Sequence, residues 1–526
     1  MVNILTDVPK IIYNLLMDII RSIKINTEIK NNHIYEYIIL GSGPAGLQAG
    51  YYLEKYKKDY IILEKMNDNG SFFKKYPIHR KLISVNKVNT GNKNKDFNLR
   101  HDWNSLLCDD DTLLFKNYTQ DFFPHADYMV KYLNDYQYKN GIKVCFNSDV
   151  KKIEKLSNGI FKLNMIDKII KCKKLIIATG LTKNIVGYKS CFKPNNNCLN
   201  YKDLSMDKSK FKNKNICILG KGNSAFETAN YLTDTAAVIQ LYAKGPLNYA
   251  WDTHYPGHLR AINNDFLDVY NLKTQHSVNI IDEDEEIIIK KKRNKFYIFT
   301  DIDIDKFGKW DKKNHVAGSS IDQHPNGGFD YIIDCTGFKM DTSIYSNFKP
   351  DNNGKVPYVN GDLQSRNINN LYFAGVLSQE ISYKYGSAAF VHGFRYIISS
   401  MIKIDTNNLT IHKFKSIREL TEKIIHRMNT TSALYQMFNC LCDVIIFEDN
   451  NIIYIEEVTT RYATNNYTTV NNKVILFSLK YGEIYEINKK IEKRKYGFGY
   501  IHNGYINNEA DYDGGLKETA HLSHFI

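Results

Sequence analysis

The chain has 526 residues, 43% of them hydrophobic, so it can bury several cores, and we expect two or three domains rather than a small stapled scaffold. Its formal net charge of +13 comes from 70 Lys and Arg against 57 Asp and Glu, and the basic runs adjoin acidic or polar stretches, which favours solvated loops over a nucleic-acid surface. Nine scattered cysteines without a C-x-x-C pair give no sign of a disulfide framework or a thioredoxin-type dithiol, so a reducing compartment is the simpler expectation.

Residues 1–33 are predicted to form an amphipathic N-terminal extension. The apolar run at 11–20 contains Asn14 and Asp18 and is shorter than the roughly 18 residues that a membrane span needs. It fits an amphipathic helix better than a signal peptide, and the final residues do not form a retention signal for the endoplasmic reticulum. We expect no integral membrane segment and a cytoplasmic location; the lumen of the endoplasmic reticulum is the alternative if the N-terminus acts as a signal.

A first strand, glycine turn and helix are predicted at 35–54, where a β-prone run leads into a G-x-G-x-x-G sequence. Gly41 permits a tight turn, Gly43 lets the backbone approach a pyrophosphate, and Gly46 lets the helix pack closely on the strand. The next strand, 60–63, ends at Glu64, where a carboxylate can accept hydrogen bonds from an adenosine ribose. The residues expected to hold FAD here are Gly41, Gly43, Pro44, Ala45, Gly46, Glu64, Lys65 and Val150.

A second unit of the same design begins with a strand at 215–219 and enters a helix at 226–232. Its second strand, 238–242, ends without a carboxylate and is followed by Lys244, a cation that suits a ribose 2′-phosphate. We therefore favour NADPH over NADH, with Lys244 or Arg260 holding a phosphate. The residues expected to hold the nicotinamide cofactor are Gly220, Gly222, Asn223, Ser224, Ala225, Lys244 and Arg260.

Strands at 175–180 and 331–337 run into small-residue turns, and their order resembles the two-dinucleotide-binding-domain flavoproteins, in which such strands cross between the FAD and NAD(P) domains. The resemblance implies that a return strand at 370–375 and a helix over 387–401 close the flavin site, although Gly375 is followed here by Val376 and not by the usual Asp. It adds Gly180, Gly337, Gly375, Ser387 and Ala388 to the expected cofactor residues.

The predicted fold class is α/β, with two Rossmann-like dinucleotide-binding domains and a small α+β C-terminal extension. We expect the FAD-binding domain at 34–205 and 341–404, the inserted NAD(P)H-binding domain at 206–340, and the extension at 405–526. In the extension a helix is predicted over 417–443 and strands at 444–447, 452–455 and 474–479. It could be a small docking domain or pack against the core, and Cys440 and Cys442 are interpreted as core residues of its helix.

Several longer segments resemble one family of eukaryotic flavoproteins, the FAD-dependent oxidoreductase domain-containing proteins of the endoplasmic reticulum that are associated with degradation. The matching segments include 71–77, 99–107, 121–127, 222–229, 253–255, 259–264, 392–396 and 434–438. The resemblance implies a bound FAD, a link to the handling of misfolded proteins, and protein partners.

His101, Asp102 and Trp103 are the candidate catalytic residues, expected to line the isoalloxazine, with a purely structural His–Asp pair as the alternative. We expect NAD(P)H to reduce the bound FAD, which then passes electrons to an acceptor such as O₂, a quinone, or a thiol or disulfide of another protein. No His and Cys cluster has metal-ligand spacing, so no metal is predicted. A flavin-dependent monooxygenase, whose F-x-G-x-x-x-H fingerprint is missing, and a non-catalytic flavin-bearing scaffold that binds other proteins are the alternatives.

Overall fold

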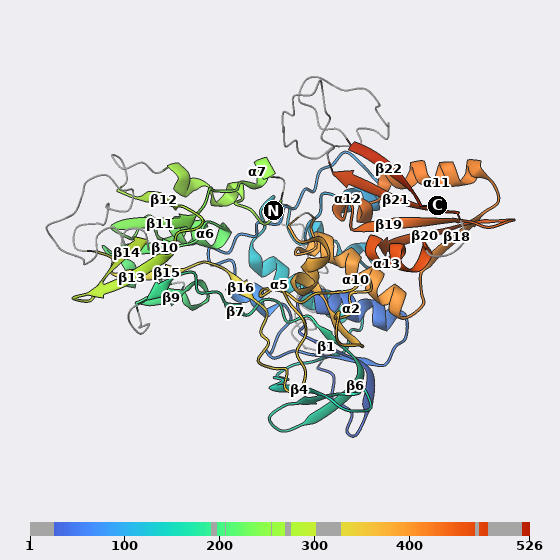
Figure 1. The fold of residues 1–526 in the computed structure, drawn as a ribbon, viewed down its shortest axis with the longest axis horizontal. Helices are drawn as coiled ribbons and strands as arrows, with labels where there is room; N and C mark the ends of the chain where they lie inside the picture. Colours follow the sequence, from blue (N-terminus) through green and yellow to red (C-terminus); the bar gives the residue numbers. More distant parts are fainter. Residues whose placement is uncertain are drawn as a thin grey trace, which may run out of the picture.

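The structure is a computed structural model. It describes residues 26–190, 197–205, 207–253, 255–268, 275–300, 328–384, 386–468, 473–481 and 518–525. The predicted amphipathic helix at 11–20 lies outside these residues. Figure 1 shows three parts: a first nucleotide unit at the bottom, a second at the left, and a C-terminal unit at the right.

The first unit is built on a mixed sheet in the order β3-β2-β1-β6-β5-β4, with β17 also paired to β6. Its strands are β1 (Ile34–Leu40), β2 (Tyr60–Leu63), β3 (Val144–Cys145), β4 (Lys152–Lys155), β5 (Phe161–Asn164), β6 (Ile169–Ile177) and β17 (Leu371–Phe373). Its helices are α2 (Pro44–Lys55), α3 (Ser71–Lys75), α4 (Lys95–Leu99), α5 (Ala126–Lys139) and α10 (Val391–Asp405). The central strand β1 runs parallel to β2 and β6, and α2 and α10 pack against each other. Because both faces of the sheet are covered, β1 and β2 are almost continuously apolar and buried.

The second unit has a fully parallel sheet in the order β12-β11-β10-β15-β9. Its elements are β9 (Cys198–Asn200), β10 (Asn215–Leu219), α6 (Asn223–Leu232), β11 (Val238–Lys244), α7 (Ala250–Thr253), β12 (Ser277–Ile281) and β15 (Tyr331–Asp334). A smaller sheet beside it joins β8 (Lys189–Ser190), β13 (Ile287–Lys292) and β14 (Lys295–Thr300). Since β9 pairs with β15, this sheet also includes residues 198–200, which lie before residue 206, the predicted start of the domain.

The chain crosses between the two units through a short ribbon in which β7 (Lys183–Asn184) pairs with β16 (Phe338–Lys339). Short 3₁₀ helices fill the connections. They are η1 (Asp111–Leu113), η2 (Phe115–Asn117), η3 (Tyr201–Asp203), η4 (Ser209–Phe211), η5 (Ala261–Asn263), η6 (Asp265–Asp268) and η7 (Gly375–Ser382). The ribbon places Gly180 and Gly337, both with positive φ, at the two crossings.

The C-terminal unit is an antiparallel sheet in the order β18-β20-β19-β21-β22. Its elements are β18 (Thr410–Phe414), α11 (Ile417–Thr430), α12 (Ala433–Gln436), β19 (Leu441–Phe447), β20 (Ile452–Thr459), α13 (Thr460–Tyr467), β21 (Lys473–Tyr481) and β22 (Glu518–Phe525). The single helix predicted over 417–443 is therefore wrong. The chain turns twice after Thr430, so Cys440 precedes a strand and Cys442 lies within it; both are buried, as core residues would be.

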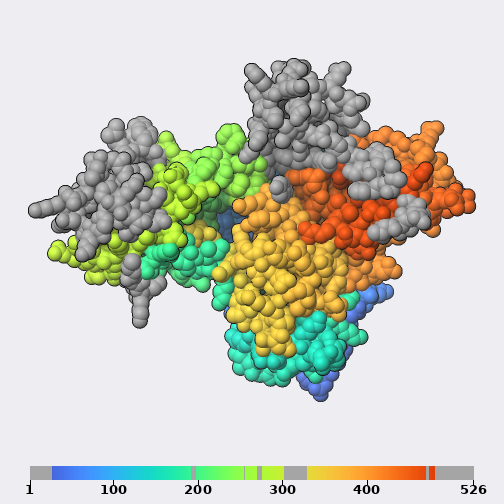
Figure 2. All heavy atoms as spheres, viewed as in Figure 1, coloured from blue at the N-terminus to red at the C-terminus, as the bar shows by residue number. Residues whose placement is uncertain are grey.

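This C-terminal unit packs against the first unit and shares its main hydrophobic core, to which Leu420, Met428 and Leu434 contribute. The buried guanidinium of Arg100, from the first unit, donates hydrogen bonds to the carbonyl oxygens of Met428 at 2.8 Å and Thr431 at 3.0 Å. Figure 2 shows the return segment (yellow) between the second unit (green) and the C-terminal unit (orange and red). The extension is thus packed on the core of the first unit.

The helix predicted to begin at Ser387 begins four residues later. Phe390 has extended backbone angles and caps α10, whose first residue is Val391. A Cβ on Gly393 would lie only 2.1 Å from the carbonyl oxygen of Ser387, so 387–390 folds back over the first turn of the helix. Ser387 and Ala388 are buried in this turn and lie outside the helix. Within the described part of the chain, no helix is long and apolar enough to span a membrane.

Candidate functional site

The first glycine turn leaves an open space at the carboxyl end of β1. Gly41 has φ +98°, and a Cβ there would lie 2.8 Å from the carbonyl oxygen of Ala178; a Cβ on Gly46 would lie 1.8 Å from that of Gly41. Among the described atoms, nothing lies within 4 Å of a Cβ built on Gly43, which caps α2 ahead of Pro44. Gly41 and Gly46 therefore allow close packing. The middle glycine, Gly43, faces free space at a helix N-terminus, where a phosphate is favoured.

Glu64 closes the same turn. The residue is 6% exposed. Its carboxylate accepts hydrogen bonds from the backbone N–H of Ser42 at 2.8 Å, from the Ser42 hydroxyl at 3.1 Å and from the N–H of Met66 at 2.9 Å. A carboxylate has about four acceptor positions, so one remains for a ribose hydroxyl. Beside Glu64, the ammonium of Lys65 lies 3.4 Å from the carboxylate of Asp149. Val150, which follows Asp149 in the chain, packs on the core.

The return segment approaches this turn from the other side. Gly375 has φ +71°, and a Cβ there would lie 2.7 Å from the Cβ of Ala45, so only glycine fits between η7 and α2. Ala45 is itself buried. The structure thus brings Gly375 to the first turn, whereas Ser387 and Ala388 lie before the start of α10.

The second turn repeats this geometry at the end of β10. Gly220 has φ +126°, and a Cβ there would lie 2.7 Å from the carbonyl oxygen of Cys335. Within the described residues, the space around a Cβ on Gly222 is empty to 4 Å. Ala225 is fully buried where the first unit requires Gly46, so α6 leaves room for one methyl group against its strand.

Asn223 and Ser224 begin α6. The Asn223 side chain donates to the carbonyl oxygen of His258 at 2.8 Å and accepts from the N–H of Arg260 and the amide of Asn263, both at 2.9 Å. It therefore braces the loop that follows α7, a role that the sequence analysis did not assign to it. The carbonyl oxygen of Ser224 accepts a hydrogen bond from Thr228 one turn later.

Two lysines meet at the end of β11. The ammonium of Lys221, from the glycine turn, donates to the carbonyl oxygen of Lys244 and lies 3.9 Å from the exposed carboxylate of Glu283. Lys244 is the last residue of β11. The Gly220 N–H bonds the carbonyl oxygen of Tyr242 as the Gly41 N–H bonds that of Leu63, so Ala243 stands where the first unit has Glu64, and Lys244 matches Lys65. This end of the second sheet therefore carries two cations.

A stack of rings joins the two units. Trp103 of the first unit lies parallel to the imidazole of His392, with ring centroids 4.2 Å apart, and the guanidinium of Arg260 covers the tryptophan at 4.9 Å. Burial lowers the pKa of Arg260. The predicted phosphate-binding role of Arg260 is not what this placement favours, because the cation packs on an aromatic face at the contact between the units.

Asp102 holds its own turn. Its carboxylate accepts from the N–H groups of Asn104 and Ser105, both at 2.9 Å, and from the Ser105 hydroxyl. Neighbouring His101 packs against Phe97, and burial, with help from nearby cations, lowers its pKa. In the described residues no hydrogen bond joins the side chains of His101 and Asp102, so the structural His–Asp pair is not formed. The expected position of His101, Asp102 and Trp103 beside the isoalloxazine stays a prediction. Asp102 is a structural residue of the loop that presents Trp103.

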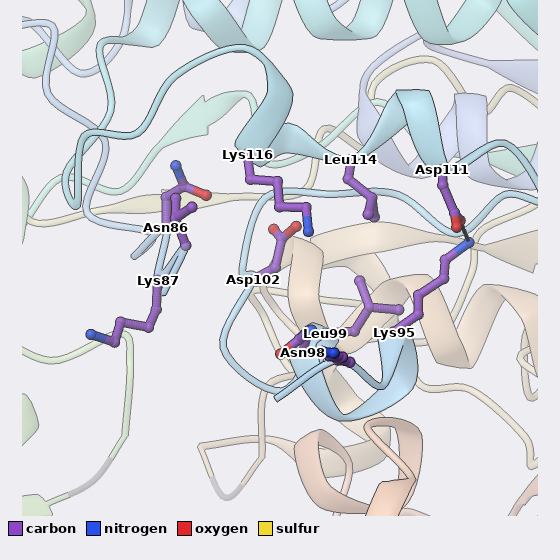
Figure 3. A pocket seen from close by; sticks show the side chains of 11 residues that line it. Asn86, Lys87, Lys95, Asn98, Leu99, Asp102, Asp111, Leu114 and Lys116 are labelled. Carbon is purple, nitrogen blue, oxygen red and sulfur yellow. Dashed lines mark hydrogen bonds and ion pairs between the residues drawn. The ribbon is translucent and has the colours of Figure 1, made fainter. Parts of the chain in front are cut away.

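A cavity of about 200 Å³ opens beside this loop, and Figure 3 shows Asp102 and Lys116 facing it and Lys95 paired with Asp111. Its lining residues are Asn86, Lys87, Val88, Lys93, Lys95, Asn98, Leu99, Asp102, Asp111, Leu114 and Lys116. Three of its four lysines are exposed at the surface. Neither glycine turn contributes to the lining, so the cavity is not the dinucleotide site.

The model of the pyridine nucleotide-disulphide oxidoreductase family matches residues 38–375, which include both glycine turns and both crossings. The chain belongs to this family. It is 35% identical over 466 residues to the FAD-dependent oxidoreductase domain-containing protein 2 of Danio rerio and 34% identical over 452 residues to that of Mus musculus. Each match covers 80% of this chain and 66% of the relative, so the chain spans slightly less than two thirds of those proteins. The predicted family resemblance is confirmed.

The fold is similar to a solved structure of the bacillithiol disulfide reductase Bdr from Bacillus cereus, with a TM-score of 0.50 and 16% identity. The match covers 71% of this chain and 99% of that one. It confirms the predicted α/β class with two dinucleotide-binding domains in this pyridine nucleotide-disulphide oxidoreductase.

Sequence reasoning missed a pair of polar side chains that lie at the same offset from their glycine turns. Gln48 on α2 is fully buried; its amide donates to the carbonyl oxygen of Leu107 at 3.0 Å and accepts from the Leu107 N–H at 2.7 Å. Glu227 on α6 is 4% exposed and accepts from the N–H of Ile78 and from the Tyr201 hydroxyl at 2.9 Å. Aligning the two turns by their glycines would have revealed this pair.

Glu227 lies at the contact between the units. Ile78 comes from the first unit yet is buried in the core of the second, together with Phe226. Nearby, Nε2 of His79 lies 3.0 Å from the amide oxygen of Asn263. Burial raises the pKa of Glu227. The charge of His79 and the groups that donate hydrogen bonds to the Glu227 carboxylate lower this pKa in part. Among the described residues, no group of three or more His, Cys, Asp or Glu is placed to hold a metal ion.

Proposed function

We propose that this chain is an FAD-dependent oxidoreductase in which NAD(P)H, held by the second unit, reduces FAD held by the first. The observation that carries the proposal is the pair of turns, each with free space at its middle glycine and a helix N-terminus behind it. One dinucleotide delivers a hydride and the other receives it, so two such sites in one chain have a direct chemical use.

The residues present fit these two cofactors differently. Glu64 keeps one free acceptor position for an adenosine ribose, and Lys65 and Val150 border the same end of the first sheet. The second sheet offers Lys221 and Lys244 there, with the exposed carboxylate of Glu283 3.9 Å from Lys221, and β11 itself ends without an acid. Cations suit a 2′-phosphate and an acid suits a free hydroxyl, which supports NADPH as the reductant.

Bound FAD would supply the redox chemistry, and the residues of this chain would bind, orient and shield it. The first turn would fix the pyrophosphate, and Gly375 would let the return segment close over it. Between the units, the guanidinium of Arg260 lies 4.9 Å over the ring of Trp103, and this contact would help to shield the region where the two cofactors meet.

The electron acceptor is proposed to be a separate molecule. The sequence has no C-x-x-C pair, and burial raises the pKa of the Cys108 thiol to about 11 and that of Cys440 to about 12. Thiols with raised pKa values are poor nucleophiles at neutral pH, so these cysteines do not fit an internal electron relay. The acceptor would be O₂, a quinone, or a thiol or disulfide of a partner protein. We also propose that this chain is located in the cytoplasm. Imaging the tagged full-length chain in cells would test this location against the endoplasmic reticulum.

The proposal is tested by the absorbance spectrum of the purified chain, followed by anaerobic addition of NADPH or NADH. We expect a flavin spectrum that NADPH bleaches faster than NADH, with colour returning when O₂ or another acceptor is admitted. Insertion of an oxygen atom from O₂ into an added substrate, coupled to oxidation of NADPH, would instead support a monooxygenase. A bound flavin that neither nucleotide bleaches would contradict the proposal and favour the scaffold.

Two matched variants separate the sites. Gly43 and Gly222 have ordinary backbone angles and open surroundings, so Gly43→Glu and Gly222→Glu should fold while placing a carboxylate where a pyrophosphate would bind. We expect Gly43→Glu to be purified without flavin. Gly222→Glu should keep its flavin but be bleached by NADPH at least about 100-fold more slowly, because like charges repel across a short distance. Equal behaviour of the two variants would contradict the assignment of one cofactor to each unit.

A further inference from the structure

The turn between β12 and β13 lies beside the end of β11 and consists of acidic residues, 282–286. β11 and β12 are parallel neighbours in the sheet of the second unit (Figure 1), and their pairing ends with Lys244 opposite Ile281. The N–H of Gly245 then donates to the carbonyl oxygen of Ile281 at 2.7 Å. The acidic turn therefore begins at the end of β11, where the adenosine ribose of a bound dinucleotide would lie.

One of these acids, Glu283, folds back over the end of β11. Its Oε1 lies 3.9 Å from the ammonium of Lys221, which belongs to the second glycine turn. A Cβ built on Gly245 would lie 2.3 Å from the same Oε1, so the Glu283 side chain lies directly over the backbone at that glycine. The side chain is 76% exposed, and an exposed ion pair of this kind contributes little to stability, so Glu283 is free to leave this position.

The carboxylate of Glu283 faces the cations that the second unit offers to a nucleotide. The ammonium of Lys221 also donates to the carbonyl oxygen of Lys244, which places it against the end of β11. That strand ends without an acid of its own, because Ala243 stands where the first unit has Glu64. Within the described part of the chain, the carboxylate paired with Lys221 is that of Glu283, from the turn after β12.

The first unit has a corresponding acid in a different setting. Asp149 follows β3, the strand beside β2, and its carboxylate lies 3.4 Å from the ammonium of Lys65. There, Glu64 supplies the acceptor for a ribose hydroxyl, separately from the pair of Asp149 and Lys65. In the second unit, the lysine that Glu283 pairs with is itself a group that would meet the ligand.

A carboxylate and a phosphate compete for the same ammonium. Both are anions that accept charge-assisted hydrogen bonds, and two anions beside one lysine repel each other. A 2′-phosphate that binds at Lys221 would therefore have to displace the carboxylate of Glu283. A free 2′-hydroxyl carries no charge and makes no such demand.

We propose that Glu283 is a specificity-determining residue of the second unit, whose carboxylate occupies the cation that the 2′-phosphate of NADPH would take. NADPH has to displace this carboxylate, whereas NADH does not. Glu283 thus weakens the preference for NADPH that Lys221 and Lys244 create. This inference rests on the proposed function, because it requires a nicotinamide nucleotide at the second glycine turn.

The test measures nucleotide binding apart from redox chemistry. Adenosine 2′,5′-bisphosphate and adenosine 5′-monophosphate differ only in the 2′-phosphate and carry no nicotinamide. Isothermal titration calorimetry gives the dissociation constant of each for the purified full chain and for Glu283→Gln, which keeps the size of the side chain and removes its charge. We expect the bisphosphate to bind Glu283→Gln about fivefold more tightly, since two unit charges about 4 Å apart in water change a binding constant by about that factor. The monophosphate should bind both proteins alike.

Two further variants separate the charge of Glu283 from its position. Asp284→Asn removes the same charge from the next residue of the turn, which is exposed, and should leave the bisphosphate affinity within about twofold of the wild type. Gly245→Ala keeps the charge but places a methyl group where Oε1 lies, so the Glu283 side chain has to move and bisphosphate binding should tighten as in Glu283→Gln. The melting temperature of Gly245→Ala reports separately the strain of an alanine at φ +68°.

Three outcomes would overturn the inference in different ways. If Glu283→Gln weakens binding of adenosine 5′-monophosphate, the carboxylate accepts from the ribose and does not oppose a phosphate. If the wild type and Glu283→Gln bind each probe alike while NADPH still bleaches the wild-type flavin, Glu283 has no part in nucleotide choice, and the proposed function stands. If the wild type binds neither probe and neither NADPH nor NADH bleaches its flavin, the proposed function fails, and this inference fails with it.

Discussion

The two nucleotide units share a turn but differ in how tightly they are built around it. In both, the first glycine has positive φ, and a Cβ built on it would lie close to a carbonyl oxygen just past the crossover strand, 2.8 Å from that of Ala178 for Gly41 and 2.7 Å from that of Cys335 for Gly220. The third position differs, because Gly46 leaves no room for a methyl group, whereas Ala225 is accommodated. The shared features are those that a pyrophosphate needs; the differing ones concern packing of the helix on the strand.

The units also differ in the charge of the side chain that clamps a neighbouring segment. Gln48 binds both backbone groups of Leu107 as a neutral amide, whereas Glu227 accepts from two donors and is acidic. The first clamp lies within its own unit, while the second holds a segment of the other unit. The comparison teaches that the same position on two related helices serves internal packing in one unit and contact between units in the other.

The largest expected effect comes from exchanging glycine and alanine at the third position of the two turns, and it falls on the free energy of unfolding. Gly46→Ala would place a Cβ 1.8 Å from a backbone oxygen, so α2 must move from its strand, and we expect a loss of about 3 kcal/mol or more. The reciprocal Ala225→Gly should cost about 1 kcal/mol, because it removes one buried methyl group and adds backbone freedom. Chemical denaturation of both variants measures the difference; equal losses would contradict the packing distinction.

Exchanging amide and carboxylate at these two positions should have different effects on the free energy of unfolding. Gln48→Glu buries an unpaired charge next to the carbonyl oxygen of Leu107, and we expect a loss of about 3 kcal/mol at pH 7. Glu227→Gln keeps an oxygen to accept from Ile78 and Tyr201 and removes a buried charge, so stability should be unchanged or higher by about 1 kcal/mol.

The same exchange predicts a pH dependence. Because burial raises the pKa of Glu227, the folded chain holds this proton more tightly than the unfolded chain, so the contribution of Glu227 to stability is present below the unfolded value of about 4.3 and is lost as pH rises through the folded pKa. Melting temperatures of the wild type and Glu227→Gln over a pH series should therefore diverge in favour of the variant as pH rises. Parallel curves would show that the carboxyl is not the titrating group.

The smallest expected effect is on the choice of nucleotide. Lys244→Ala should lower kcat/KM for flavin reduction by NADPH about tenfold and leave that for NADH nearly unchanged, because one charged contact to the 2′-phosphate is lost. Lys413→Ala removes an exposed lysine of the C-terminal unit and serves as the control. An equal loss with both nucleotides would mean that Lys244 contacts a group that NADPH and NADH share.

Much of the nucleotide framework could be predicted because its signals are local. The strands at 35–40, 60–63, 215–219 and 331–334 and the helix after each glycine turn follow from apolar runs and glycine spacing, and all are present. The helix after 430 was misjudged because an apolar run fits a buried strand as well as a helix. The start of α10 depends on Gly393 meeting Ser387, a contact that no local pattern records.

The sequence alone determined the class of fold, the two glycine turns and the absence of an acid after β11, because each depends on residues within one strand, turn and helix. Only the tertiary structure decided what the polar side chains around those turns do. Asp102 holds its loop, Asn223 braces another, and Arg260 covers Trp103. Among the described residues, neither ring nitrogen of His392 has a hydrogen-bond partner. These roles depend on contacts between segments far apart in the chain, and burial and partners are set only when the segments pack together.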